Sequence, residues 1–170
     1  MIDKLNFIFV TFFGIGKIKK IPGTFASLFT MLLLFFLFHI LNFSPNIILV
    51  IIILIFFISL FAVKIYIKDL NNKDAKEVVI DEVIGQSIPL YLYEVSHNIE
   101  KDSIDALKFY LIIFILFRFF DIAKPFPVNY FDKNFKNSFG VIMDDVCAGL
   151  YVVLVLILYM IFIWKNFLKK

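Results

Sequence analysis

Two long apolar stretches, at residues 25–43 and 46–67, constrain the fold of this chain more than any other feature. An α-helix rises 1.5 Å per residue, so each stretch is long enough to cross the roughly 30 Å hydrocarbon core of a bilayer. The second stretch carries no charge before Lys64, and a short turn containing Pro45 separates the two. The pair therefore predicts a membrane-spanning helical hairpin.

The composition extends this prediction to the whole chain. The 170 residues are 62% apolar and include 24 phenylalanines, and a soluble domain of this size could not bury so much apolar surface. Further apolar segments at 77–93, 106–120 and 143–164 indicate helices, the first with a kink near Pro89. We therefore predict one all-α domain, residues 1–170, built as a polytopic membrane helical bundle with four to five embedded helices.

The number of crossings depends on the segment 83–96, which is short for a span. With four crossings, the charged residues of the C-terminal half lie on the opposite face from the earlier ones. With five crossings, one face collects the polar residues Thr24, Asp81, Glu82, Arg118, Asp121, Asp144 and Asp145. Most lysines fall on that face too, so the positive-inside tendency favours five crossings and a cytoplasmic position for this face.

Charged residues between the later apolar helices indicate a functional site. A charge at membrane depth costs about 2.5–3.5 kcal/mol on insertion scales, so a chain that only has to cross a bilayer leaves it out. Arg118 and Asp121 are three residues apart and share a helix face, where they either form a structural ion pair or prepare a ligand site. Lys124 adds a second cation beside one carboxylate, and the fork of the arginine suits phosphate.

Two pairs of adjacent carboxylates suggest a metal ion. Asp144 and Asp145 lie in the expected first turn of the last helix, and neither has a cation within one turn of sequence. Favourable interaction with the helix dipole explains one of them, but not two. Asp81 and Glu82 form the second pair, and oxygen ligands from several helices suit Mg²⁺. With the cations and the apolar surroundings, this pattern indicates metal-assisted chemistry on a lipid phosphate.

Other functions fit the residues less well. A membrane ion or lipid transporter with intramembrane carboxylates is the competing class, but no inverted repeat supports it. Cys147 lacks the arginine six residues later that a cysteine phosphatase needs, and His39 and His97 are too few and unsuitably placed for a histidine phosphatase. No basic patch with interleaved aromatic residues indicates a nucleic-acid partner.

Four ordered motifs carry a resemblance to a known family. They are PGTFAS at 22–27, DEVIG at 81–85, RFFDIAKPFP at 118–127 and MDDVCAG at 143–149. Together they closely resemble the A-type phosphatidylglycerophosphatases of bacteria, over nearly the full chain. Ala26 stands where family members usually carry glycine.

The resemblance implies a Mg²⁺-dependent, all-helical enzyme of the bacterial inner (cytoplasmic) membrane, with its active site facing the cytoplasm. Such an enzyme removes the terminal phosphate of phosphatidylglycerophosphate, a phospholipid in the bilayer, and yields phosphatidylglycerol. The oligomeric state and the number of metal ions stay open.

The resemblance also implies roles for individual residues. The expected Mg²⁺ ligands are Asp81, Glu82, Asp144 and Asp145. One of these four is alternatively the base toward the attacking water. Asp121 either completes the metal shell or orients Arg118. The phosphomonoester is expected to bind Arg118 and Lys124, with help from Thr24.

Overall fold

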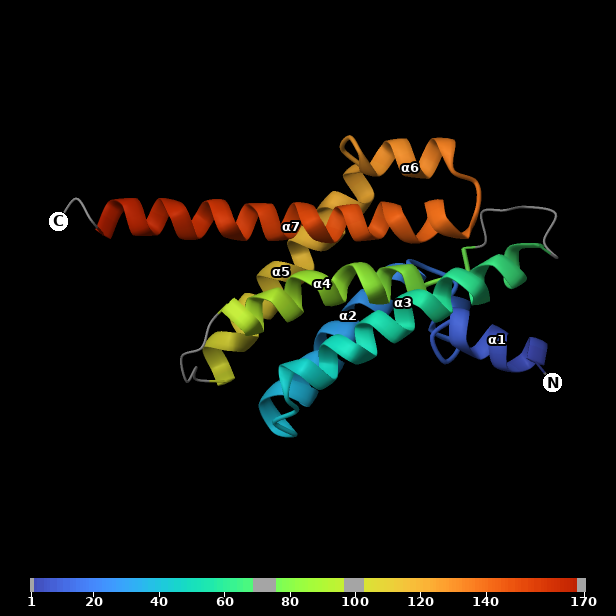
Figure 1. Cartoon of the computed structure of the whole chain (residues 1–170), viewed down its shortest axis with the longest axis horizontal. Helices are drawn as coiled ribbons and strands as arrows, with labels where there is room; N and C mark the ends of the chain where they lie inside the picture. The colour runs from blue at the N-terminus through green and yellow to red at the C-terminus, as the bar shows by residue number, and fades with distance from the viewer. Residues whose placement is uncertain (1, 69–75, 97–102, 168–170) are drawn as a thin grey trace.

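The computed structural model describes residues 2–68, 76–96 and 103–167 (Figure 1). Within these ranges the chain is helical and contains no strand. The elements are α1 (Ile2–Val10), a 3₁₀ turn (Ile15–Lys17), α2 (Pro22–Phe35), a π-helical extension of α2 (Phe36–Ile40), α3 (Pro45–Lys68), α4 (Ile80–Ser96), α5 (Ser103–Ala123), α6 (Val128–Asn134) and α7 (Ser138–Phe167). The prediction of an all-α helical bundle is confirmed.

Helix α4 forms the centre of the bundle. It packs most extensively against α7 and also contacts α2, α3 and α5. Figure 1 shows α4 running beside the first half of α7, while the second half of α7 projects beyond the other helices. The short α6 lies across the start of α7, and α1 packs against α3 at the opposite edge.

Because the helices alternate in direction, the starts of some helices and the ends of others lie together at one end of the bundle. Helices α2, α4 and α7 begin at this end, and α3 and α5 finish there (Figure 1). A helix N-terminus carries unpaired backbone N–H groups and the positive end of the helix dipole. This arrangement brings the carboxylates in the first turn of α4 and those about two turns into α7 to a single end of the molecule.

Three of the described helices are long and apolar enough to cross a membrane, namely Pro22–Ile40, Pro45–Lys68 and Ser138–Phe162. The predicted hairpin at 25–43 and 46–67 is confirmed as α2 with its extension and α3. Helix α4 has only 17 residues, and α5 includes the charged residues Arg118 and Asp121. The count of three is lower than the predicted four to five, and the five-crossing topology stays a prediction.

Two predicted helix starts are wrong. Helix α7 begins at Ser138 and not at Met143, because the side chain of Asn137 accepts a hydrogen bond from the Gly140 N–H at 3.0 Å and caps the earlier turn. The paired aspartates, Asp144 and Asp145, therefore lie well inside α7 and not in its first turn.

At α2, Thr24 lies inside the helix, which starts three residues before the predicted stretch 25–43. The helix begins at Pro22, a residue suited to a first helical position. Between the predicted apolar segments 106–120 and 143–164, the chain also forms α6.

Two glycines allow α4 and α7 to lie unusually close. A Cβ atom added to Gly85 would lie 2.5 Å from the carbonyl oxygen of Asp145, and one added to Gly149 would lie 2.4 Å from the carbonyl oxygen of Gly85. Any larger residue at either position would push the helices apart. This contact brings the start of α4 next to the aspartates of α7.

Candidate active site

A cavity of about 400 Å³ opens at the end of the bundle where these termini meet. Helices α2, α4, α5, α6 and α7 all contribute to its wall. The wall includes every residue that the sequence predicted for the site: Thr24, Asp81, Glu82, Arg118, Asp121, Lys124, Asp144 and Asp145. Motifs separated by up to 120 residues of chain therefore form one site.

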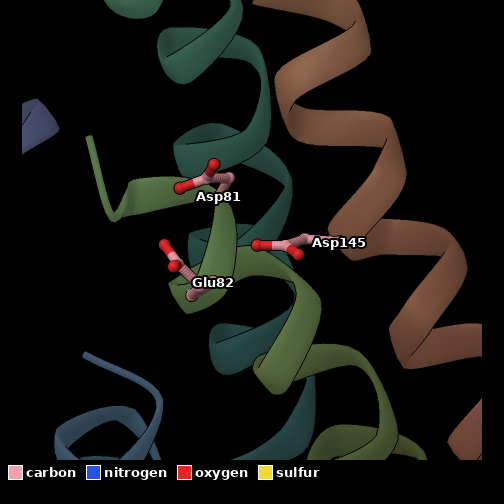
Figure 2. Close-up of side chains that lie close together, drawn as sticks. All are labelled: Asp81, Glu82 and Asp145. Carbon is pink, nitrogen blue, oxygen red and sulfur yellow. The ribbon is translucent and has the colours of Figure 1, made fainter. Parts of the chain in front are cut away.

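Three carboxylates form the acidic part of the cavity. Asp81 and Glu82 project from α4, and Asp145 reaches toward them from α7 (Figure 2). One carboxylate oxygen from each lies within 4.8 Å of the others. The cluster brings together three of the four predicted metal ligands.

No cation in the described part of the chain forms an ion pair with these three carboxylates. Asp81 Oδ1 and Glu82 Oε2 are also buried without a hydrogen-bond partner. Buried charge that is neither paired nor hydrogen-bonded is costly. Hard divalent cations bind carboxylate oxygens in this kind of arrangement, so the cluster is suited to hold Mg²⁺.

The first turn of α2 makes room for Glu82. A Cβ atom added to Gly23 would lie only 1.8 Å from Glu82 Oε1. The backbone of Gly23 thus forms the surface against which this carboxylate rests. The same turn is tied to α5, because Ser27 donates to the Gly23 carbonyl at 2.9 Å and accepts a long hydrogen bond from Arg118 at 3.4 Å.

Arg118 and Asp121 form the ion pair that their spacing predicted. Arg118 Nη1 lies 2.6 Å from Asp121 Oδ2, and both side chains are largely buried. The Nε–H of Arg118 has no hydrogen-bond partner, so the guanidinium keeps a donor for a ligand. The geometry therefore favours a role for Asp121 in orienting Arg118 over a place in the three-carboxylate cluster.

Asp144 lies outside the three-carboxylate cluster and contacts Lys124. The Lys124 ammonium donates to Asp144 at 3.0 Å and to Asp132 on α6 at 2.6 Å. Burial alone would lower the pKa of Lys124, but the bonds and charges of Asp132 and Asp144 outweigh it and raise that pKa above its ordinary value. Lys124 therefore stays protonated at neutral pH.

The expected local excess of positive charge is wrong. Among the described residues, the cavity wall has four cationic side chains, Arg118, Lys124, Lys76 and Lys136. It has six carboxylates, from Asp81, Glu82, Asp121, Asp132, Asp144 and Asp145. With every group counted as ionised, the wall has a formal net charge of two negative units. Lys124 also faces two carboxylates that the sequence had not placed beside it. A bound divalent cation would bring the sum to zero.

Sequence reasoning missed Asp132, Lys76, Lys136 and Ile21, which also line the cavity. Asp132 follows Lys124 by eight residues across a turn, and no helix or strand periodicity links such positions. The sequence has lysines around positions 76 and 136, but no pattern assigned them to the site. Ile21 holds a left-handed backbone conformation (φ 49°) just before α2, which no side-chain pattern reveals.

Comparisons with known proteins show the family to which this chain belongs. A family model described as phosphatidylglycerophosphatase A matches residues 8–160. A Haemophilus influenzae phosphatidylglycerophosphatase A is 36% identical over 145 residues, which cover 84% of this chain and 81% of the relative. An Escherichia coli phosphatidylglycerophosphatase A is 28% identical over 138 residues (81% of this chain, 73% of the relative).

A Bacteroides thetaiotaomicron protein, whose name proposes phosphatidylinositol-3-phosphatase activity, is 34% identical over 144 residues (83% of this chain, 84% of the relative). No solved structure matches the chain significantly. The family match spans nearly all of the cavity-forming helices, and it includes all four motifs. The chain is a member of the phosphatidylglycerophosphatase A family.

Proposed function

We propose that this membrane protein hydrolyses the terminal phosphomonoester of phosphatidylglycerophosphate and yields phosphatidylglycerol. One observation carries the proposal: the cavity joins three unpaired carboxylates to an arginine and a lysine at one end of an apolar bundle. Membership of the family and the names of the Haemophilus influenzae and Escherichia coli relatives support the choice of substrate.

The three-carboxylate cluster is the proposed Mg²⁺ site. Its fit rests on the two carboxylate oxygens that lack any partner and on the negative charge of the cavity wall. Asp81, Glu82 and Asp145 would hold the ion, which favours oxygen ligands and keeps some of its waters. Bound there, Mg²⁺ supplies Lewis-acid polarisation of the phosphoryl group and activation of water.

The basic residues are assigned to the phosphate. Arg118 offers its unpartnered Nε–H and the charge of its guanidinium, and Asp121 holds the guanidinium in place. Lys124 is held toward the cavity by Asp132 and Asp144. Thr24 adds a hydroxyl in the wall. These contacts position the phosphorus and stabilise the charge that develops on its oxygens.

Asp144 is assigned as the base. It lines the cavity next to Asp145 but lies outside the three-carboxylate cluster, and although it accepts a hydrogen bond from Lys124, its oxygens keep further lone pairs that can take up a proton. Water attacks the phosphorus and gives a proton to Asp144. The bond from phosphorus to the glycerol oxygen breaks, that oxygen receives the proton from Asp144, and phosphatidylglycerol and inorganic phosphate leave.

The proposed orientation places the cavity on the cytoplasmic side of the bacterial inner membrane. Exposed lysines gather at this end, including Lys17, Lys19 and Lys20 in the loop before α2. Positive loops favour the cytoplasmic side. Labelling Lys136 and Lys64 from each side of sealed vesicles tests the orientation, because both lie near the cavity end and should react from the same side.

The proposed activity is tested with the purified full chain and phosphatidylglycerophosphate in mixed micelles. We expect Mg²⁺-dependent release of inorganic phosphate that EDTA stops and added Mg²⁺ restores. A transporter would release none. The same assay with phosphatidylinositol 3-phosphate asks whether the substrate suggested by the Bacteroides thetaiotaomicron name is also hydrolysed.

A further inference from the structure

The rim of the cavity differs from its interior. The acidic residues and the ion-paired cations of the wall are buried or half-buried. Among the described residues of the wall, four are exposed, namely Lys76, Lys136, Ile21 and Ile122. The entrance is therefore amphipathic, with two cations and two branched apolar side chains.

We propose that this rim binds the phosphodiester of the substrate and the glycerol and acyl groups beside it. Lys76 and Lys136 contact the phosphodiester, and Ile21 and Ile122 contact the apolar part. The rim thereby selects phosphomonoesters that are joined to a lipid through a phosphodiester. This inference rests on the proposed function and names what determines its specificity.

The charges support a separate site for the phosphodiester. Arg118 and Lys124 already form ion pairs inside the cavity, where they can serve the phosphomonoester. In the described part of the chain, neither Lys76 nor Lys136 forms an ion pair with a carboxylate. As far as the described residues show, the two rim lysines are thus available to an anionic group that lies outside the interior.

The size of the cavity supports the same division. At about 400 Å³, it falls at the small end of the usual range for ligand pockets. That volume suits a phosphomonoester with its glycerol unit and excludes two long acyl chains. When the terminal phosphate lies beside Arg118, the phosphodiester, one glycerol unit away, lies toward the rim.

The two isoleucines form the apolar part of the entrance. Ile21 is 62% exposed and Ile122 is 72% exposed, although both line the cavity. Ile21 also follows Lys19 and Lys20 and has a left-handed backbone, which is uncommon for a β-branched residue. Residues in such uncommon backbone conformations are held by the structure around them and cluster at active sites and ligand-binding sites.

The main test is the double variant Lys76→Gln, Lys136→Gln. Its KM for phosphatidylglycerophosphate should rise roughly tenfold or more, because contacts with a charged group are lost, while kcat changes little. Phosphatidate with the same acyl chains has a phosphomonoester but no phosphodiester. Its apparent affinity, measured as a substrate or as a competing inhibitor, should stay the same.

Lys133→Gln is the matched control, because Lys133 is an exposed lysine of α6 that does not line the cavity. It should leave both lipids unaffected. An unchanged KM for phosphatidylglycerophosphate in the double variant, or an equal loss of affinity for both lipids, would overturn the inference. The proposed function fails separately, if the unmodified chain releases no phosphate from phosphatidylglycerophosphate.

The variant Ile21→Asn tests the apolar part. Asparagine tolerates a left-handed backbone better than isoleucine, so the melting temperature should not fall. The KM for phosphatidylglycerophosphate with long acyl chains should rise by about threefold to tenfold, for the loss of roughly one apolar contact. A lower melting temperature with an unchanged KM would mean that Ile21 has only a structural role.

Discussion

Both ends of the bundle bury ionisable side chains, but among the described residues the two ends differ in how their carboxylates are partnered. At the end away from the cavity, His39 Nε2 lies 3.1 Å from Glu94 Oε1, and both side chains are 12% exposed. The ring of His39 stacks on Phe35 with 4.7 Å between centroids, and Tyr110 lies edge-on to it. At the cavity end, Asp81, Glu82 and Asp145 come together, and no cation of the described residues forms an ion pair with them.

The difference separates a structural polar contact from a ligand site. A hydrogen-bonded pair between packed aromatic rings joins the end of α2 to α4 and leaves nothing for a ligand. Unpaired buried carboxylates destabilise the fold unless a ligand compensates them, and an uncompensated buried charge costs about 3–5 kcal/mol. The sequence contains charged residues in both places, and only their partners tell the two ends apart.

Removing a carboxylate from the three-carboxylate cluster should have the largest effect on activity. Asp145→Asn keeps the size of the side chain but removes its charge, so Mg²⁺ should bind weakly. Mutation of a residue that only supports a metal ligand typically lowers metal affinity or activity by about 10–100-fold. For a direct ligand we therefore expect the rate of phosphate release to fall by at least about 100-fold. Glu94→Gln is the control at the far end, and it should keep most of the activity. Full activity in Asp145→Asn would remove this residue from the metal site.

Arg118→Lys should have the next largest effect. Lysine keeps the charge but cannot reproduce the planar fork or the bond to Asp121. We expect kcat/KM for phosphatidylglycerophosphate to fall by about 10–100-fold, with the Mg²⁺ requirement unchanged. The control is Lys108→Arg at an exposed site of α5 away from the cavity. Normal kinetics in Arg118→Lys would contradict the role in phosphate binding.

Gly23→Ala should act through Glu82. The added methyl group would lie 1.8 Å from Glu82 Oε1, so the carboxylate must move away from Asp81 and Asp145. We expect the Mg²⁺ concentration for half-maximal activity to rise by roughly tenfold, with the fold intact. Shortening the acid with Glu82→Asp in the same chain should recover part of the loss. An unchanged Mg²⁺ requirement would show that the position of Glu82 does not matter.

The smallest effect on activity should come from His39→Ala at the far end. The change leaves Glu94 without its partner and removes the ring that stacks on Phe35. We expect the free energy of unfolding to fall by about 1–3 kcal/mol, while kcat at low temperature stays near normal. A large loss of kcat at a temperature where the chain is folded would mean that the far end contributes to the reaction.

The lengths of the apolar segments and the sequence motifs predicted the helical hairpin and the residues of the site. The hairpin of α2 and α3 followed from two long apolar stretches, and all of the predicted site residues line one cavity. The three-residue spacing of Arg118 and Asp121 predicted that they share a helix face. These features depend on local periodicity or on length, which a sequence displays directly.

The features that were missed depend on contacts between segments. Asn137 starts α7 one turn early and thereby moves Asp144 and Asp145 away from the helix end. Asp132 and Lys124 meet because α6 folds back over α7, and no spacing in the sequence indicates this turn. Asp144 contacts Lys124 and lies outside the three-carboxylate cluster.

Mg²⁺ binding to the purified chain, measured by calorimetry without any lipid, tests the central claim most directly. The unpaired carboxylates predict saturable binding to the unmodified chain and a loss of that binding in Asp145→Asn. Glu94→Gln, at the paired end, should bind as the unmodified chain does. Equal binding in the unmodified and Asp145→Asn chains, or none in either, would contradict the assignment of the cavity end as the metal site.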